Sequence, residues 1–200
     1  KITDELIAEM RDNDRILKSI AMPIQHISDK MLKAMNRHYD TARYLDTVRY
    51  MRRKMPDVTL TSDIIVGFPG ETEEDFECTL AALRRARFDM IFSFQYSARE
   101  GTPAAKMDCQ VPKDIVAERF ERLLALQNEI SYESNKKLEG KTLRVLCDGP
   151  SKNNPDTFSG RTEGSKIVLF EGESADVGKF VNILIERADT FALSGKIIRK

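Results

Sequence analysis

The stretch Thr61–Thr72 contains the residues best suited to binding a ligand. An apolar strand runs into a loop with two glycines, Gly67 and Gly70, and then into a helix that Thr72 can cap. Ligands of parallel sheets and barrels gather at the carboxyl ends of strands, where glycines let backbone amides approach closely. The same pattern also describes an ordinary tight turn, so the loop alone indicates no particular ligand.

Three further polar segments follow predicted strand ends. They are residues 23–29 (Pro-Ile-Gln-His-Ile-Ser-Asp), residues 35–37 (Met-Asn-Arg) and residues 96–105, which begin Tyr-Ser-Ala-Arg. The arginine of the last segment, Arg99, could address a carboxylate or a phosphate through its planar guanidinium. The carboxyl ends of several strands therefore carry groups suited to a polar ligand.

Two acidic residues and one histidine near these segments have two interpretations each. Asp63 lies in an apolar strand and needs a partner if it is buried. Glu71 either touches a ligand or only favours the start of the following helix electrostatically. His26 fits a hydrogen-bonded structural imidazole at least as well as a polar residue beside a ligand.

The cysteines do not form a metal site of their own. The chain has three, Cys78, Cys109 and Cys147, which are 31 and 38 residues apart and match no local metal-ligand spacing. Free thiols in a reducing compartment are the favoured interpretation. We expect no metal ligand in this chain.

The composition is that of an ordinary globular protein. The 200 residues are 41% hydrophobic and carry 32 basic and 32 acidic side chains, which excludes disordered, collagenous and coiled-coil proteins. No run approaches the roughly 18 apolar residues that cross a bilayer, so we expect a cytoplasmic protein with no membrane partner. Zero net charge argues against a globally electrostatic nucleic-acid binder but not against a local basic face.

The first part of the chain alternates helices and strands. Hydrophobic periodicity predicts helices over residues 2–10, 28–35, 41–55 (with Leu45, Val48, Met51 or Arg52, and Met55 on one face), 72–83 and 113–138. It predicts strands over residues 16–20, 58–66 and 90–96, the last two buried. Such alternation implies a parallel sheet with crossover helices, either open or closed into a barrel.

The character of the sequence changes near Gly140. Five short β-type runs follow, over residues 143–147, 157–162, 166–170, 180–186 and 191–198, which predict a small barrel. Residues 1–139 hold 22 basic against 24 acidic residues, and residues 140–200 hold 10 against 8. A domain boundary between residues 139 and 140 is therefore expected, with any polyanion site in the second domain.

A basic face on the second domain would suit RNA. Its candidate residues are Lys141, Arg144, Lys152, Arg161, Lys166 and Lys179. Phe158, Phe170 or Phe180 could offer a stacking surface for unpaired bases. Charges on a small barrel are more often merely solvated, and phenylalanines there are more often part of the core.

Taken together and in this order, the glycine loop and the three polar segments strongly resemble the radical S-adenosylmethionine (SAM) methylthiotransferase family. Members have an N-terminal domain with three cysteines on one iron–sulfur cluster, a radical SAM barrel with a CxxxCxxC loop, and a C-terminal RNA-binding β-barrel called TRAM. The resemblance covers essentially the whole chain. It implies an α/β fold: the second half of the parallel barrel in residues 1–139, followed by a small all-β TRAM barrel in residues 140–200.

The resemblance also implies cofactors and binding residues. The cofactors are SAM and two 4Fe-4S clusters, whose cysteine ligands lie outside this chain. We therefore expect a C-terminal fragment that is inactive alone and works, as a monomer, with the missing N-terminal portions of the same polypeptide and an unidentified electron donor. Residues implied to contact SAM or substrate are Gln25, Ser28, Asp63, Gly67, Phe68, Gly70, Glu71, Tyr96 and Arg99.

The substrate branch follows from shorter segments. Residues 149–152, 159–162 and 178–181 resemble the branch that methylthiolates dimethylallyl- or isopentenyl-adenosine beside the tRNA anticodon. An anticodon stem-loop is then the expected partner. Residues 25–28 (Gln-His-Ile-Ser) point instead to relatives that modify a ribosomal protein. A short, non-catalytic tRNA-binding protein is the alternative from another class.

Overall fold

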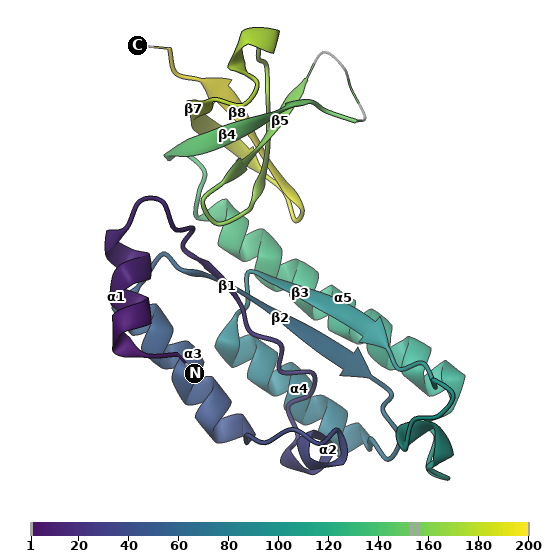
Figure 1. Ribbon diagram of the computed structural model, residues 1–200. Coiled ribbons are helices and arrows are strands. Elements are labelled where there is room, and N and C mark those ends of the chain that lie inside the picture. Colours follow the sequence, from purple (N-terminus) through teal and green to yellow (C-terminus); the bar gives the residue numbers. More distant parts are fainter. Residues whose placement is uncertain (1, 153, 155–156, 200) are drawn as a thin grey trace. The chain divides into compact units, whose positions relative to one another are not determined.

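The computed structural model describes residues 2–152, 154 and 157–199, and the chain divides into two compact units (Figure 1). The first unit holds residues 20–130 together with the start of the chain up to Ile7, and the second holds residues 8–19 and those from Ser131 onward. Helices α1 (Asp4–Asp12) and α5 (Lys113–Lys136) contribute residues to both units. The boundary expected at residues 139 and 140 stays a prediction.

A three-stranded sheet forms the centre of the first unit. Its order is β1 (Ser19–Ala21), β2 (Thr59–Val66) and β3 (Met90–Gln95), and β2 and β3 are parallel, as expected. The strand predicted over residues 16–20 is displaced: β1 begins only at Ser19, because Arg15 is still held in a turn by the Asn13 side chain.

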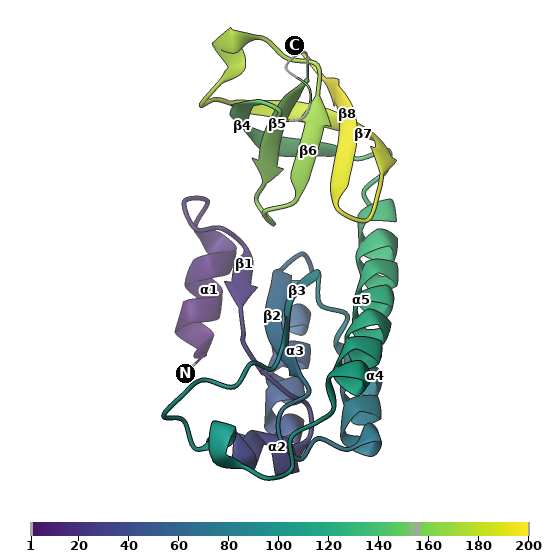
Figure 2. The same ribbon diagram turned by 90° about the vertical axis from the view of Figure 1, so that its right-hand side faces the viewer.

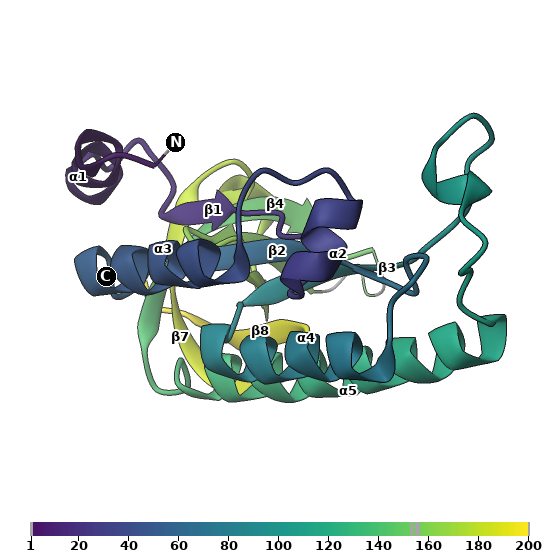
Figure 3. The same ribbon diagram turned by 90° about the horizontal axis from the view of Figure 1, so that it is seen from below.

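Helices cover one side of this sheet. They are α2 (Asp29–Ala34), α3 (Thr41–Lys54), α4 (Glu73–Ala86) and the first part of α5. Figure 2 shows α4 and α5 on the same side of β2 and β3, and Figure 3 shows these two helices side by side. Alternate β2 side chains, such as Ile64 and Val66, are fully buried beneath the helices. The prediction of a parallel sheet with crossover helices is confirmed.

Two predictions about buried faces are wrong. On α3, Tyr44 occupies the core position expected for Leu45. The strand β3 is not buried: Phe92 and Phe94 are 48% and 51% exposed. The register places Phe92 opposite Asp63 of β2, on the side of the sheet that the helices do not cover. Only the side chains that face the helices, such as Ile91, are buried.

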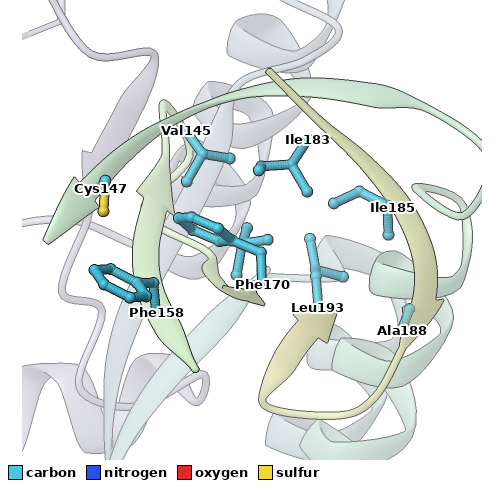
Figure 4. Close-up of a cluster of buried hydrophobic side chains, with 9 residues drawn as sticks. Val145, Cys147, Phe158, Phe170, Ile183, Ile185, Ala188 and Leu193 are labelled. Carbon is cyan, nitrogen blue, oxygen red and sulfur yellow. The ribbon is translucent and has the colours of Figure 1, made fainter. Parts of the chain in front are cut away.

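The second unit contains a closed five-stranded barrel, as predicted. Its strands are β4 (Thr142–Pro150), β5 (Phe158–Thr162), β6 (Ile167–Phe170), β7 (Phe180–Ala188) and β8 (Ala192–Ile197). They close in the order β4-β5-β6-β8-β7, in which only β6 and β8 pair in parallel. Inward side chains from all five strands fill the interior, among them Val145, Phe170 and Ile183 (Figure 4).

The end of α5 is built into the barrel unit. Asn135, which is 5% exposed, donates from Nδ2 to the carbonyl oxygens of Asp189 (2.7 Å) and Thr190 (3.1 Å). Glu139 accepts a hydrogen bond from the Ala188 amide at 2.8 Å. These contacts satisfy backbone groups in and beside the β7–β8 turn. Among the helices of the described ranges, none is long and apolar enough to cross a membrane.

Candidate functional site

The glycine loop connects β2 to α4 as expected. Both glycines have positive φ angles, 79° at Gly67 and 84° at Gly70, a conformation that other residues adopt only with strain. The Thr72 hydroxyl accepts from the Asp75 amide while the Asp75 carboxylate accepts from the Thr72 amide, so the predicted cap at Thr72 is part of a capping box.

The loop packs tightly against α5. A Cβ atom on Gly67 would lie 2.4 Å from Val116 Cγ2, so only glycine fits there. The Gly67 amide donates to Glu71 Oε2 (3.0 Å), the Gly70 amide to the Cys109 carbonyl (2.8 Å), and the Glu71 amide to the Phe68 carbonyl (3.0 Å). Two of the loop amides, those of Gly67 and Gly70, are therefore already used inside the protein, as is that of Glu71, so a ligand would meet the loop through its other atoms.

Glu71 lies beneath this loop with its side chain fully buried. Its Oε2 atom accepts from Gly67 and lies 3.1 Å from His26 Nε2, and its Oε1 atom accepts from Arg119 NH1 at 2.7 Å. All these partners belong to the protein. The predicted contact between Glu71 and SAM stays a prediction, and the geometry supports a role within the fold instead.

Ser28 is tied to the capping box of α4. Its hydroxyl donates to Asp75 Oδ1 at 2.6 Å, and Lys30 Nζ lies 3.0 Å from Asp75 Oδ2. Burial by itself raises the pKa of the Asp75 carboxyl, but hydrogen bonds from Ser28, the Thr72 backbone and Lys30 outweigh it and hold that pKa well below its usual range. The Ser28 hydroxyl is thus occupied in this structure.

The remaining predicted residues lie along β2 and beyond the ends of β2 and β3. The Gln25 amide donates to the Asp63 carbonyl (2.8 Å), and Gln25 itself has a φ of 71°. Phe68 and Tyr96 form an edge-to-face pair with ring centroids 5.3 Å apart. The buried Tyr96 hydroxyl has no hydrogen-bond partner among the described residues. Arg99 is exposed on the following loop.

One residue of the site escaped the sequence analysis. Arg119 lies on α5, far along the chain from the glycine loop, yet its guanidinium holds Glu71 and, at 3.0 Å, Glu73. A signal was available, because Arg119 interrupts a stripe of buried apolar residues at helical spacing. The other members of that stripe are Val116, Leu123, Leu126 and Ile130.

On the barrel, one predicted basic residue is stacked on an exposed aromatic ring. The Arg144 guanidinium carbon lies 3.8 Å from the centre of the Phe180 ring, which is 55% exposed. Phe180 and Arg161 each pair with Leu146 of β4, one from either side, so they share the outer face of β7, β4 and β5. This face combines guanidinium groups with an open aromatic surface.

The other predicted barrel residues have different surroundings. Phe158 and Phe170 lie in the barrel core, 7% and 2% exposed, so the prediction that they offer a stacking surface is wrong. Lys166 donates from Nζ to Asn135 Oδ1 at 2.8 Å, which makes it part of the junction between α5 and the barrel. The remaining predicted residues, Lys141, Lys152 and Lys179, are exposed lysines.

Cysteines and acidic residues do not converge anywhere in the described ranges. No group of three or more histidine, cysteine, aspartate or glutamate side chains that could hold a metal ion occurs among these residues. Cys78 and Cys109 are exposed and Cys147 is buried, and all three are free thiols.

Comparison with known proteins identifies both units. Residues 1–83 match the profile of the Radical SAM superfamily, and residues 136–198 match that of the TRAM domain. The fold is similar to that of coproporphyrinogen III oxidase from Escherichia coli, a radical SAM enzyme, with a TM-score of 0.56 over 82% of this chain and 44% of that one at 12% identity. The chain is thus a radical SAM protein with a TRAM domain.

Curated relatives narrow the family. A protein of Acetivibrio thermocellus named tRNA-2-methylthio-N(6)-dimethylallyladenosine synthase is 48% identical over 99% of this chain and 41% of its own length. A protein of Clostridium botulinum with the same name is 46% identical over 98% of this chain and 44% of its own length. The chain belongs to the radical SAM methylthiotransferase family and spans less than half the length of these relatives.

The residues at the end of the sheet fit SAM. The unpartnered Tyr96 hydroxyl offers a hydrogen bond to a polar ligand atom, whereas the adjoining Phe68 ring is only 7% exposed and packs against Tyr96. The iron–sulfur clusters of the family find no ligand set among the described residues of this chain. With three widely spaced cysteines in the sequence, ligands for two clusters must come from elsewhere.

Proposed function

We propose that this chain supplies part of the SAM-binding barrel and the tRNA-binding domain of an enzyme that converts dimethylallyl- or isopentenyl-adenosine beside the anticodon to its 2-methylthio derivative. One observation carries the proposal: identity of 48% to a relative with that name extends over 99% of the chain, through both units. SAM and two 4Fe-4S clusters, when bound, supply the radical, sulfur and methyl chemistry. The chain's own residues bind and orient.

The cofactor end of the proposal depends on Tyr96, against which the buried Phe68 ring packs. We expect the Tyr96 hydroxyl to donate to a polar atom of SAM, because a buried hydroxyl without a partner costs about 1–3 kcal/mol and a ligand would remove that cost. Gln25, whose backbone amide donates to the Asp63 carbonyl, and Asp63 within β2 are proposed as further polar contacts of the ligands. Arg99, on the exposed loop, is proposed to meet a carboxylate, phosphate or ribose of the ligands.

Calorimetric titration of the full chain with SAM tests this part. Tyr96→Phe should weaken SAM binding about tenfold, which corresponds to one hydrogen bond of roughly 1.4 kcal/mol. Tyr132→Phe, on the half-exposed Tyr132 of α5, is the matched control and should leave the affinity unchanged. Equal affinities for Tyr96→Phe and the unaltered chain would remove the hydroxyl from the site.

The RNA end of the proposal depends on the outer face of β7, β4 and β5. Unpaired anticodon-loop bases can stack on Phe180 and Arg144, because aromatic rings and guanidinium planes both accept a base face. Arg161, Lys179, Lys141 and Lys152 would contact phosphates from the same barrel. Arg144 and Arg161 lie near acidic neighbours, Glu163 at 3.9 Å and Asp148 at 3.6 Å, distances long enough for phosphate to replace them.

Binding of an anticodon stem-loop, measured at several salt concentrations, tests this part. Phe180→Ala and Arg144→Ala should each reduce affinity about tenfold, since stacking contributes about 1–3 kcal/mol per base, and affinity should fall with salt. Arg187→Ala removes a charge from an exposed side chain on the same barrel and is the matched control. Salt-insensitive binding, or equal loss in all three variants, would contradict the assigned face.

The substrate itself is tested in the source organism. Deleting the gene should abolish 2-methylthio-adenosines in tRNA, as measured by nucleoside mass spectrometry. Loss of the modification from a ribosomal protein instead would favour the alternative family branch. His26, which belongs to the segment that suggested that branch, is 1% exposed, and its ring nitrogens pair with Glu71 and the Ser28 amide. We further propose that the protein is a monomer and that it works in the cytoplasm, where tRNA is modified.

A further inference from the structure

A continuous chain of hydrogen bonds runs beneath the glycine loop. Arg119 donates to Glu71 Oε1 at 2.7 Å, Glu71 Oε2 lies 3.1 Å from His26 Nε2, and Ser28 donates from its backbone amide to His26 Nδ1 at 3.0 Å. The side chains of Arg119, Glu71 and His26 are 6%, 0% and 1% exposed. The chain links α5, the glycine loop and the segment before α2, which are far apart in sequence.

The donor and the acceptor of each hydrogen bond in this network are fixed. Because the Ser28 amide can only donate, His26 Nδ1 must carry a lone pair. The proton of the neutral imidazole then sits on Nε2 and is donated to Glu71. Glu71 receives a second donor, the Gly67 amide, on the same oxygen, so the carboxylate accepts from three donors, and its fully buried side chain is closed to a ligand.

We propose that Glu71 is a positioning residue which, through Arg119 and His26, holds the glycine loop and Ser28 in the shape that binds SAM. This inference rests on the proposed function, since it assigns how that cofactor site is held. Gly67 is fixed from both sides, by its amide on Glu71 and by Val116 against its Cα. Ser28 is fixed through His26 at its amide and through Asp75 at its hydroxyl.

The substitution Glu71→Gln should disturb the hydrogen bonds on both sides of Glu71. A glutamine side chain has one oxygen that accepts and one amide group that donates. It therefore cannot accept from Arg119 on one side and from Gly67 and His26 on the other. If its amide faces His26, the imidazole must move its proton to Nδ1, where it opposes the Ser28 amide. If its amide faces Arg119, two donors meet in a buried site. Either arrangement breaks the hydrogen-bond network at one of its ends.

Nuclear magnetic resonance on the full chain tests the proposal without requiring activity. Nitrogen-15 shifts of His26 should show the proton on Nε2, and a proton on Nδ1 or on both nitrogens would overturn the inference before any variant is made. In Glu71→Gln, hydrogen exchange of the Gly67 and Ser28 amides should quicken at least tenfold, and affinity for SAM should fall at least tenfold. Arg119→Lys, which keeps the charge but not the fork, should show the same changes at smaller size.

Glu73→Gln is the matched control, because Glu73 is the half-exposed second partner of the same arginine. It should change neither exchange at Gly67 and Ser28 nor the affinity for SAM. Faster exchange in Glu71→Gln with unchanged affinity would overturn the positioning role. An unaltered chain that does not bind SAM at all would overturn the proposed cofactor site instead, and the exchange data would then show the network to be purely structural.

Discussion

Replacing Gly67 with alanine isolates the close packing between the glycine loop and α5. The new Cβ atom would lie 2.4 and 2.9 Å from the two Val116 methyl carbons, at a φ of 79°. The left-handed conformation costs about 1–2 kcal/mol for alanine, and overpacking costs about 1–3 kcal/mol more. We therefore expect Gly67→Ala to lower the free energy of unfolding by roughly 2–5 kcal/mol.

Gly101 provides a control matched in backbone conformation. Its φ is 83°, but a Cβ atom there would meet nothing within 4 Å, so Gly101→Ala should cost only the conformational part. Urea unfolding followed by helical circular dichroism measures both variants, since α2, α3 and α4 lie in the α/β unit. Adding Val116→Ala to Gly67→Ala should recover about 1–3 kcal/mol relative to additivity. Equal costs at the two glycines, or purely additive effects, would refute the reasoning.

Three further predictions concern buried polar groups. Burial raises the pKa of Tyr44 to about 12 from an ordinary value of 10.0, so its contribution to stability is complete below pH 10 and disappears as pH rises to about 12. Across that range the unaltered chain should lose roughly 2–3 kcal/mol more than Tyr44→Phe in urea unfolding, and equal losses would contradict this. For Asp75, hydrogen bonds outweigh burial and lower the pKa below 3.8, so its contribution is present above that pH and is lost as pH falls below it. Asp75→Asn should cost about 1 kcal/mol near neutral pH and flatten the acid limb of stability against pH. Asn135→Ala should destabilise the barrel by about 1–3 kcal/mol, seen as a lower barrel melting temperature, whereas the exposed Asn182→Ala should have no effect.

Hydrophobic periodicity was sufficient to predict most elements of this fold. The five barrel strands and the alternation around β2 follow from local patterns, because each buried face repeats at the period of its own backbone. The capping box at Thr72 was also local, three residues wide. Such features depend only on residues that are close in the sequence, so the sequence alone predicts them.

Exposure and tertiary pairing could not be obtained in this way. The apolar run of β3 looks like a core strand, yet Phe92 and Phe94 are exposed because cover depends on what lies across the sheet. Arg119 joins Glu71 across 48 positions, a pairing that no local pattern contains. At Gly67 the sequence indicated a loop that approaches a ligand. The structure shows a second reason for glycine there, because Val116 occupies the space that a Cβ atom would need.

The ring of strands in the barrel has a consequence for the order in which it folds. The β4-β5-β6 meander joins strands that are close in sequence, and so does the β7–β8 hairpin, so both can form by rapid local search. The ring closes only when β4 meets β7 and β6 meets β8, for example Thr142 with Leu184 and Ile167 with Ala192. Joining these two preformed pieces is then the slow step. A break in the long connection between β6 and β7 should leave both pieces able to form but slow their assembly, because closure would become a collision between separate chains.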